Sequence, residues 1–252
     1  SITFTGLQIT RGSVQVSAYS PAAAGTYCLV SSWGSSAVNV RCFDKGGQAT
    51  DCRYLVTVFG VGYNKPSQIV AYVWANNQTS ASYTPSTAYS YNAGGGAVIA
   101  KRSAVGTYQL TFGGSSFTAR GNMMVSTYGS KERCIVKSWS GSSINVQCTN
   151  TAGAAADSRF LLAVADKGIT TQAKILAWTW ADKANSGSYT ASPSYSFNGG
   201  GGAIKISRSA VGTYAVDFTG TVITFGQVQI TAYNDNRSCS VSSFSGSRVN
   251  VD

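Results

Sequence analysis

The stretch Ser103–Tyr108 (SAVGTY) recurs letter for letter as Ser209–Tyr214, at an offset of 106 residues. Outward from this stretch, cysteines and tryptophans obey the same offset. The matching pairs include Cys28 with Cys134, Trp33 with Trp139, Cys42 with Cys148, and Trp74 with Trp180. Self-similarity at a fixed period is the mark of a repeat architecture, so this repeat decides which folds are open to the chain.

Strand-like runs fill each 106-residue unit, and no helical periodicity is present. Runs rich in Val, Ile, Thr, Tyr and Phe are bounded by clusters of Gly, Ser and Asn about every 13 residues. Arg53–Phe59 and Thr107–Phe112 resemble each other and lie about 53 residues apart. The deeper period is therefore about 53 residues, which is enough for one four-stranded sheet.

The 252 residues hold four complete periods and most of a fifth, which predicts an all-β, five-bladed β-propeller as a single domain over residues 1–252. The expected blades are residues 14–60, 61–113, 114–166, 167–219, and 220–252 together with residues 1–6. The N-terminal segment Ser1–Gly6 (SITFTG) resembles the ends of other fourth strands. We therefore expect it to complete the last sheet and close the ring.

Two other folds fit the same strand pattern. Tandem immunoglobulin-like β-sandwiches of about 106 residues would leave orphan strands at both ends of the chain. Donation of the N-terminal strand to a neighbouring molecule would produce a fibre.

The composition narrows the class of function. Charged residues make up 11% of the chain and hydrophobic residues 43%, which excludes intrinsic disorder. No apolar run is long enough for a transmembrane helix. The chain has no histidine, which excludes His general bases, Ser–His nucleophile pairs and His-containing metal sites. The nine acidic residues supply no converging set of carboxylates. We therefore predict no enzymatic activity, no catalytic residue, no metal and no cofactor.

The net charge of +10 comes from 19 Lys and Arg residues that are scattered along the chain. A nucleic-acid-binding protein would show a dense basic stripe or a known module, so no specific nucleic-acid partner is expected. The predicted partner of this basic protein is a glycan or an anionic cell-surface polymer, with self-association as the alternative. Six cysteines with little charge predict a secreted, extracellular protein.

Two pairs of cysteines lie 14 residues apart, each across a turn rich in Gly and Ser. The pairs are Cys28 with Cys42 and Cys134 with Cys148. Folding each hairpin about its turn would place the two cysteines opposite each other, so two disulfides are predicted. A bridge between the remaining Cys52 and Cys239 would lock the first blade to the fifth.

Two repeated groups of aromatic and polar residues are candidates for ligand binding. Trp and Tyr rings stack on sugar faces, and Asn or Asp binds sugar hydroxyls. The candidate ligand-binding residues are Trp74, Asn76, Tyr83, Trp180, Asp182 and Tyr189. The alternative interpretation is that these aromatic residues pack between sheets. The repeated Asp-x-Arg at Asp51 and Asp157 is predicted to form a surface ion pair with the Arg two residues later.

The second half of each unit carries the motifs W-A-[ND], SYT, YS[YF]N, a Gly run and RSAVGTY. Over nearly the whole chain, these motifs resemble a tandem repeat of exported bacterial proteins of unassigned function. The resemblance implies an exported β-repeat protein and brings no catalytic residue. We predict a secreted, non-catalytic, lectin-like module that binds carbohydrate at repeated sites. The alternative is a structural or adhesive extracellular protein that self-assembles, for example by strand donation.

Overall fold

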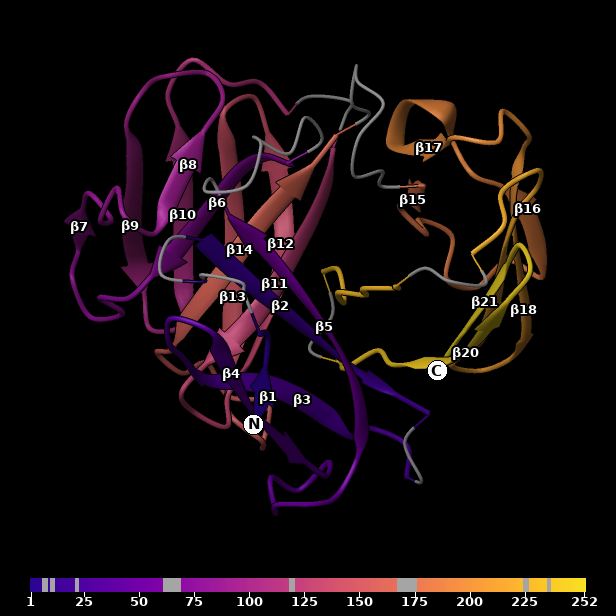
Figure 1. The fold of residues 1–252 in the computed structure, drawn as a ribbon, viewed down its shortest axis with the longest axis horizontal. Coiled ribbons are helices and arrows are strands. Elements are labelled where there is room, and N and C mark those ends of the chain that lie inside the picture. Colours follow the sequence, from indigo (N-terminus) through magenta and orange to yellow (C-terminus); the bar gives the residue numbers. More distant parts are fainter. Residues whose placement is uncertain are drawn as a thin grey trace.

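The chain is an all-β protein in which four open sheets stand beside one another (Figure 1). The computed structural model describes residues 1–5, 9, 12–20, 23–60, 69–117, 121–166, 176–223, 227–234 and 237–252. The single helical element in the described residues is a short 3-10 turn, η1 (Pro193–Tyr195). The all-β prediction is confirmed.

The strands fall into two sheets of seven, one of five and one of two. The first sheet has the order β1 (Ile2–Thr3), β4 (Ala37–Phe43), β3 (Tyr27–Trp33), β11 (Asn122–Tyr128), β14 (Arg159–Ala165), β6 (Ile69–Ala75), β8 (Ser90–Asn92). The five-stranded sheet has the order β12 (Arg133–Ser140), β13 (Ser143–Thr149), β10 (Thr107–Phe112), β9 (Val98–Ala104), β7 (Ser82–Tyr83). The small sheet pairs β15 (Ala177–Thr179) with β17 (Ser196–Asn198). The last sheet has the order β16 (Ser188–Thr190), β18 (Ile204–Ala210), β19 (Thr213–Phe218), β21 (Arg248–Val251), β20 (Val241–Ser245), β2 (Gly12–Tyr19), β5 (Arg53–Gly60).

Local sequence explains the hairpins that build these sheets. β10 alternates half-buried with buried residues along its whole length, as expected for a strand with one face on a core. The turn between β9 and β10 contains Gly106 at a φ of +65°. A Cβ on Gly106 would meet the carbonyl oxygen of Cys148. Only glycine fits this turn, because it tolerates positive φ and adds no side-chain atom.

The predicted five-bladed propeller is wrong, because none of the sheets in the described structure is closed and each predicted blade is divided between two sheets. In residues 14–60, β2 pairs with β5, whereas the intervening hairpin of β3 and β4 joins a different sheet. Residues 114–166 divide in the same way into β11 with β14 and β12 with β13. A propeller blade would keep the four strands in one meander. The alternation of buried and exposed residues is the same in both arrangements, so the sequence pattern does not distinguish them.

The N-terminal strand does not complete the last sheet. Instead, β1 pairs with β4, with Ile2 opposite Val38. The N–H of Phe4 donates to the carbonyl oxygen of Ser36 over 2.7 Å. Phe112 and Phe218 make the same bond with Ser142 and Ser247. The N-terminal segment is therefore a copy of β10 and β19, as its sequence indicates. Its partner, however, is β4, the third strand of residues 14–60, and not a strand of the last sheet.

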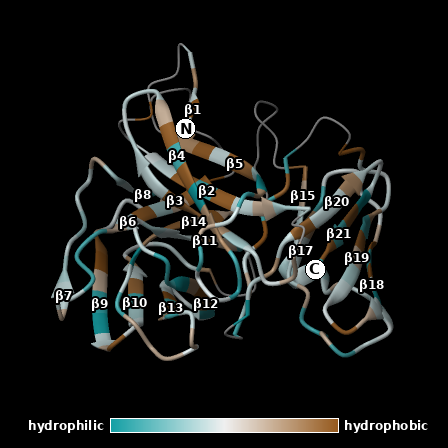
Figure 2. Cartoon of the chain, turned by 90° about the horizontal axis from the view of Figure 1, so that it is seen from below, coloured by the Kyte–Doolittle hydropathy of each residue, from teal (hydrophilic) through white to brown (hydrophobic). Residues whose placement is uncertain are grey.

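Residues 69–165 form a complete β-sandwich. One layer contains β8, β6, β14 and β11, and the other is the five-stranded sheet. A single core cluster fills the space between the layers, and all its fully buried members lie between Ala71 and Val164. Figure 2 shows hydrophobic residues concentrated on strands, among them β2 and β5. The sandwich therefore takes the second half of one sequence repeat and the first half of the next.

β2, β11 and residues 227–233, which occupy the same place in successive repeats, are linked in a closed cycle. Each of these segments donates a backbone N–H to a side-chain hydroxyl of the next segment, and the third donates back to the first. The three bonds run from Val16 to Ser126 (2.9 Å), from Val125 to Thr231 (3.1 Å) and from Ile230 to Ser17 (3.0 Å). Three parallel bridges follow the same cycle: Tyr128 with Val30, Tyr19 with Val241, and Tyr233 with Val136. The three repeats therefore interlock around a common centre, which a row of independent sandwiches would not do.

Both predicted disulfides are present. Cys28–Cys42 and Cys134–Cys148 each cross a hairpin, with Cα atoms 4.0 Å apart. The bridge between Cys52 and Cys239 that the sequence leaves open is not among the disulfides of the described residues. The ring closure that this bridge would have locked does not occur.

Candidate functional site

Two aromatic clusters occupy equivalent positions between modules, the successive segments of about 53 residues that the sequence period defines. The first junction cluster consists of Trp33, Trp74, Tyr89 and Tyr128, and the second consists of Trp139, Trp180, Tyr195 and Tyr233. Ring centroids lie 5.2 Å apart for Trp33 with Trp74 and 5.4 Å apart for Trp139 with Trp180, edge to face. Edge-to-face aromatic pairs stabilise beyond their buried area. The clusters join strands from different modules.

Trp74 and Trp180, two of the predicted sugar platforms, are central members of these clusters. The indole Nε1 of each is buried without a hydrogen-bond partner. Both rings stand edge-on to aromatic neighbours, and an indole N–H beside a ring face makes a weak N–H···π contact. In this arrangement the two indoles connect modules.

The hydroxyls of the two predicted tyrosines bind the backbone of the chain segment that precedes each of them. The N–H of Asn77 donates to the Tyr83 hydroxyl (3.1 Å), and the N–H of Lys183 donates to the Tyr189 hydroxyl (3.2 Å). Burial raises the pKa of both tyrosines. Tyr83 also packs on the core of the complete sandwich, whereas Trp74 packs on a different cluster that includes β2 and β3 residues. The structure therefore does not bring Trp74 and Tyr83 onto one face.

Asn76 and Asp182, the predicted polar members, are both exposed, two residues after Trp74 and Trp180. In the second copy, Trp180 and Tyr189 both line one large cavity.

Asp157 is the centre of a polar network, but its partner differs from the predicted one. Its carboxylate accepts two bonds from the Arg102 guanidinium, at 2.8 and 2.7 Å, one from the Tyr108 hydroxyl (3.0 Å) and one from the Gly106 N–H (2.8 Å). The Arg102 hydrogen bonds lower the pKa of Asp157 to about 2. Burial raises the pKa of Tyr108. The predicted Asp157–Arg159 ion pair does not form, because Arg159 lies over the Tyr128 ring at 5.0 Å.

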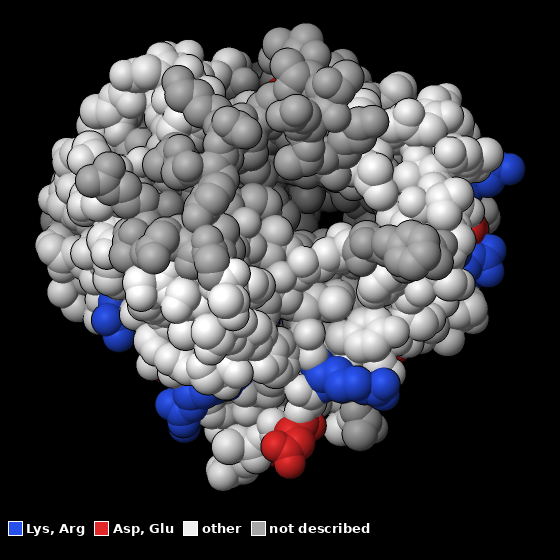
Figure 3. Space-filling view, in the orientation of Figure 1, with Lys and Arg blue, Asp and Glu red and all other residues white. Residues whose placement is uncertain are grey.

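A cavity of about 1080 Å³ opens beside β15 to β21, which we call the third set of strands. Its lining includes residues 177–181, which contain β15, residues 227–233, and Thr57–Phe59 of β5. Its floor includes Ile206, Val216 and Phe218 from β18 and β19. Figure 3 shows a hollow near the middle of this face of the molecule. We call the space between residues 177–181 and 227–233 the slot.

Sequence reasoning missed the slot and the Arg208 and Tyr214 side chains on its wall. Both are copies, at the 106-residue offset, of Arg102 and Tyr108 in the Asp157 network. The signal was present in the repeat itself, because Arg208 and Tyr214 match Arg102 and Tyr108 in an identical stretch of sequence.

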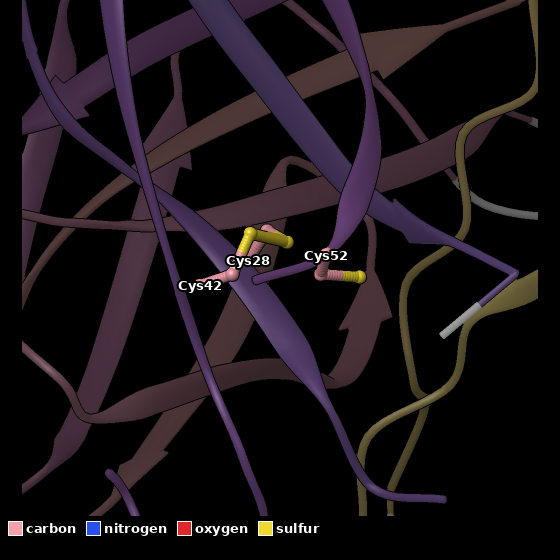
Figure 4. A group of neighbouring side chains, drawn as sticks. All are labelled: Cys28, Cys42 and Cys52. Atoms are coloured by element: carbon pink, nitrogen blue, oxygen red, sulfur yellow. A yellow bond between two sulfur atoms is a disulfide. The ribbon is translucent and has the colours of Figure 1, made fainter. Parts of the chain in front are cut away.

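The group of potential metal ligands in the described residues is Cys28, Cys42 and Cys52, whose sulfur atoms lie within 4.8 Å of one another (Figure 4). Two of these sulfurs are bonded to each other in a disulfide and offer no thiolate. Burial raises the pKa of the third, Cys52, which disfavours the thiolate that a metal needs. The group does not fit a metal centre.

Basic side chains stand in separate groups on the face shown in Figure 3, in keeping with their scatter in the sequence. Among the described residues, no helix is long and apolar enough to span a bilayer. Comparisons with protein-family models, with curated proteins and with solved structures found no match to this chain.

Proposed function

We propose that the chain is an extracellular, non-catalytic structural protein that associates with other chains through its open sheet edges. The observation that carries the proposal is the position of β5. This strand pairs with β2 over eight residues at the end of its sheet, and no described strand lies on its other side. Its repeat copy, β14, is paired on both sides, with β11 and β6. A long apolar edge strand is a template for pairing with another chain.

The use of the repeated residues supports the same proposal. The repeated tryptophans join modules, the repeated tyrosines hold the chain against the sandwiches, and Asp157 ties two sheets together. These roles build a rigid body, and none of them requires a small ligand. The two hairpin disulfides support an oxidising, extracellular location.

The test is the association state of the protein. We expect light scattering to show concentration-dependent association, and a charge on the edge to oppose it. Thr57 lies in the middle of β5 and has a polar, half-buried side chain. Thr57→Lys should weaken association tenfold or more, whereas the matched variant Thr57→Val should retain it. A protein that stays monomeric up to its solubility limit would contradict the proposal.

Glycan binding is the second candidate function, and the exposure of Asn76 and Asp182 favours it. Each is an exposed polar side chain at the same step of the repeat, two residues after a junction tryptophan. We expect Asn76→Ala and Asp182→Ala each to reduce retention on a glycan column several-fold without changing the melting temperature. Asn77→Ala, at an adjacent exposed position, is the control. Equal retention of all four proteins would remove this candidate.

A further inference from the structure

We infer that the slot is a binding site for an extended polypeptide segment with the pattern Asp-x-Arg-aromatic followed by alternating apolar residues. This inference rests on the proposed function, since it names one of the open edges and the chemistry of the chain that would fill it. The third set of strands, β15 to β21, copies most of the complete sandwich of residues 69–165.

In the complete sandwich, β14 lies between β11 and β6 and is antiparallel to both. Leu162, in its middle, faces Val125 on β11 and Val73 on β6. The copies of these two neighbours form the two sides of the slot. Residues 177–181 copy β6 at the 106-residue offset, and residues 227–233 copy β11 at an offset of 105.

The contacts of these copies match those of the originals, so the two sides stand where the neighbours of a central strand should stand. Trp180 occupies the same position as Trp74. Its backbone N–H donates to the carbonyl oxygen of Tyr195 (3.0 Å), as the backbone N–H of Trp74 donates to that of Tyr89 (3.0 Å). Tyr233 bridges Val136 as Tyr128 bridges Val30. Yet β15 pairs only with β17 in the described structure. In the described structure, no strand occupies the place between these two sides that β14 occupies between β6 and β11.

The slot is apolar in the way that a central strand requires. Val216, Phe218, Ile223 and Ile230 line it, and the corresponding positions of the complete sandwich surround β14. Side chains of a bound segment would alternate between this core and the opposite face, as those of β14 do. Strand addition gives affinity through main-chain hydrogen bonds and specificity through pockets for alternate side chains.

Four residues that line the slot each carry a buried side-chain polar atom without a hydrogen-bond partner. They are the Nε of Arg208, the Nε1 of Trp178, the Oγ1 of Thr179 and the Nε2 of Gln229. Buried polar atoms in folded proteins normally have partners, so the polar side chains around the slot are incompletely hydrogen-bonded.

Arg208 sets the chemistry of the first residue of the segment. In the complete sandwich, Arg102 and Tyr108 both bind the Asp157 carboxylate, and Tyr108 also donates to the carbonyl oxygen of Gln78 (3.1 Å). Tyr214 keeps the copy of that last bond, to Ala184 at 3.1 Å. Among the described residues, no carboxylate is hydrogen-bonded to Arg208 as Asp157 is to Arg102. A segment that supplies an aspartate two residues before its arginine would pair with Arg208 as Asp157 pairs with Arg102.

The experiment uses the full chain and a synthetic peptide with the sequence of residues 154–166 (AAADSRFLLAVAD), labelled at its N-terminus for fluorescence anisotropy. We expect saturable binding with one peptide per chain. A peptide with the Asp157→Asn change should bind at least tenfold more weakly, and a scrambled peptide should not bind. These peptide changes leave the protein untouched, so misfolding of a variant does not affect them.

Protein variants complete a double-mutant cycle. Arg208→Gln should weaken binding of the parent peptide to the level of the Asn peptide, and it should weaken the Asn peptide no further. Lys205→Gln removes a positive charge from an exposed position of the same strand and is the matched control, with unchanged binding. No saturable binding, or equal binding of the Asp and Asn peptides, would overturn the inference.

The outcomes separate this inference from the proposed function. If the protein binds the peptide but stays monomeric, peptide binding in the slot is supported and the proposed function is contradicted. If the protein associates through β5 but does not bind the peptide, the proposed function is supported and peptide binding in the slot is contradicted. Association that buries the slot against a second copy, so that excess peptide neither binds nor dissociates the complex, also overturns the inference.

Discussion

At the scale of single residues, the Asp157 network shows most clearly how one side chain holds two sheets. Asp157 lies just before β14 in one layer, and Arg102 and Tyr108 belong to β9 and β10 in the other. About a fifth of each ion-pair side chain is exposed, at 20% for Asp157 and 24% for Arg102. The bidentate geometry and the shared Tyr108 hydroxyl distinguish this pair from an isolated surface ion pair, which contributes little.

The Asp157 carboxylate should make stability depend on pH in a defined window. Arg102 lowers its pKa to about 2, below the ordinary value of 3.8. A depressed acid stabilises the fold above its unfolded-state pKa, and this contribution is lost as the pH falls from about 4 towards about 2. Asp157→Asn should lower the free energy of unfolding at pH 7 by about 2 kcal/mol, or about 4–8 °C in melting temperature. It should also reduce the fall of the melting temperature at acid pH, which we call the acid limb.

The control for this variant is Asp51→Asn. Asp51 is the repeat counterpart of Asp157, and its side chain is exposed. Because its carboxylate forms no ion pair with the described residues, its replacement should leave the melting curve and its acid limb nearly unchanged. Melting of the three proteins between pH 2 and pH 7 tests the prediction. Parallel acid limbs in the parent and Asp157→Asn proteins would refute it.

At the scale of elements, the sequence predicted what depends on neighbouring residues. The hairpin of β12 and β13 follows from its Gly-Ser turn and from the 14-residue spacing of Cys134 and Cys148, and both features are present in the structure. The prediction that the N-terminal segment is equivalent to β10 was also correct. Its partner was not, because pairing partners depend on contacts between segments far apart in the chain, and period-2 alternation is the same for every partner.

The candidate site was predictable to the same extent. Trp74 and Trp180 were found by repeat and composition, and both are large aromatic residues in equivalent surroundings. The face on which each lies was not predictable, because Trp74 and Ala75 differ by one step along β6 and therefore point to opposite sides of the sheet. The slot, in contrast, appears only when the third copy is compared in space with the second.

At the scale of the whole molecule, the sequence repeat and the folding unit are out of phase. A repeat that begins at β2 contains β2 to β10, but its two halves belong to different sandwiches. The closed cycle through Ser126, Thr231 and Ser17 then ties the repeats together. A period read from sequence locates equivalent residues without showing where one packed core ends and the next begins.

This phase difference leads to a prediction about fragments of nearly equal length. Residues 69–166 contain all the fully buried members of one core cluster, both of its layers and the Cys134–Cys148 disulfide. Residues 12–112 span one sequence repeat and contain the Cys28–Cys42 disulfide, but only β6 to β10 of that core. A fragment folds alone when it buries a sufficient core, and about 100 residues suffice for this. The first fragment should therefore melt cooperatively, and the second should not.

The measurement is thermal unfolding of the two oxidised fragments, followed by near-ultraviolet circular dichroism, with dispersion of amide signals in NMR spectra as a second observable. Fragment 69–166 should melt below the full chain, because it exposes Trp74 and Tyr128, whose cluster partner Trp33 lies on β3 outside it. Its midpoint should nevertheless be independent of concentration, as expected for a monomeric two-state domain. A cooperative transition in fragment 12–112 but not in fragment 69–166 would mean that the repeat itself is the folding unit and that residues 69–165 are not an independent sandwich.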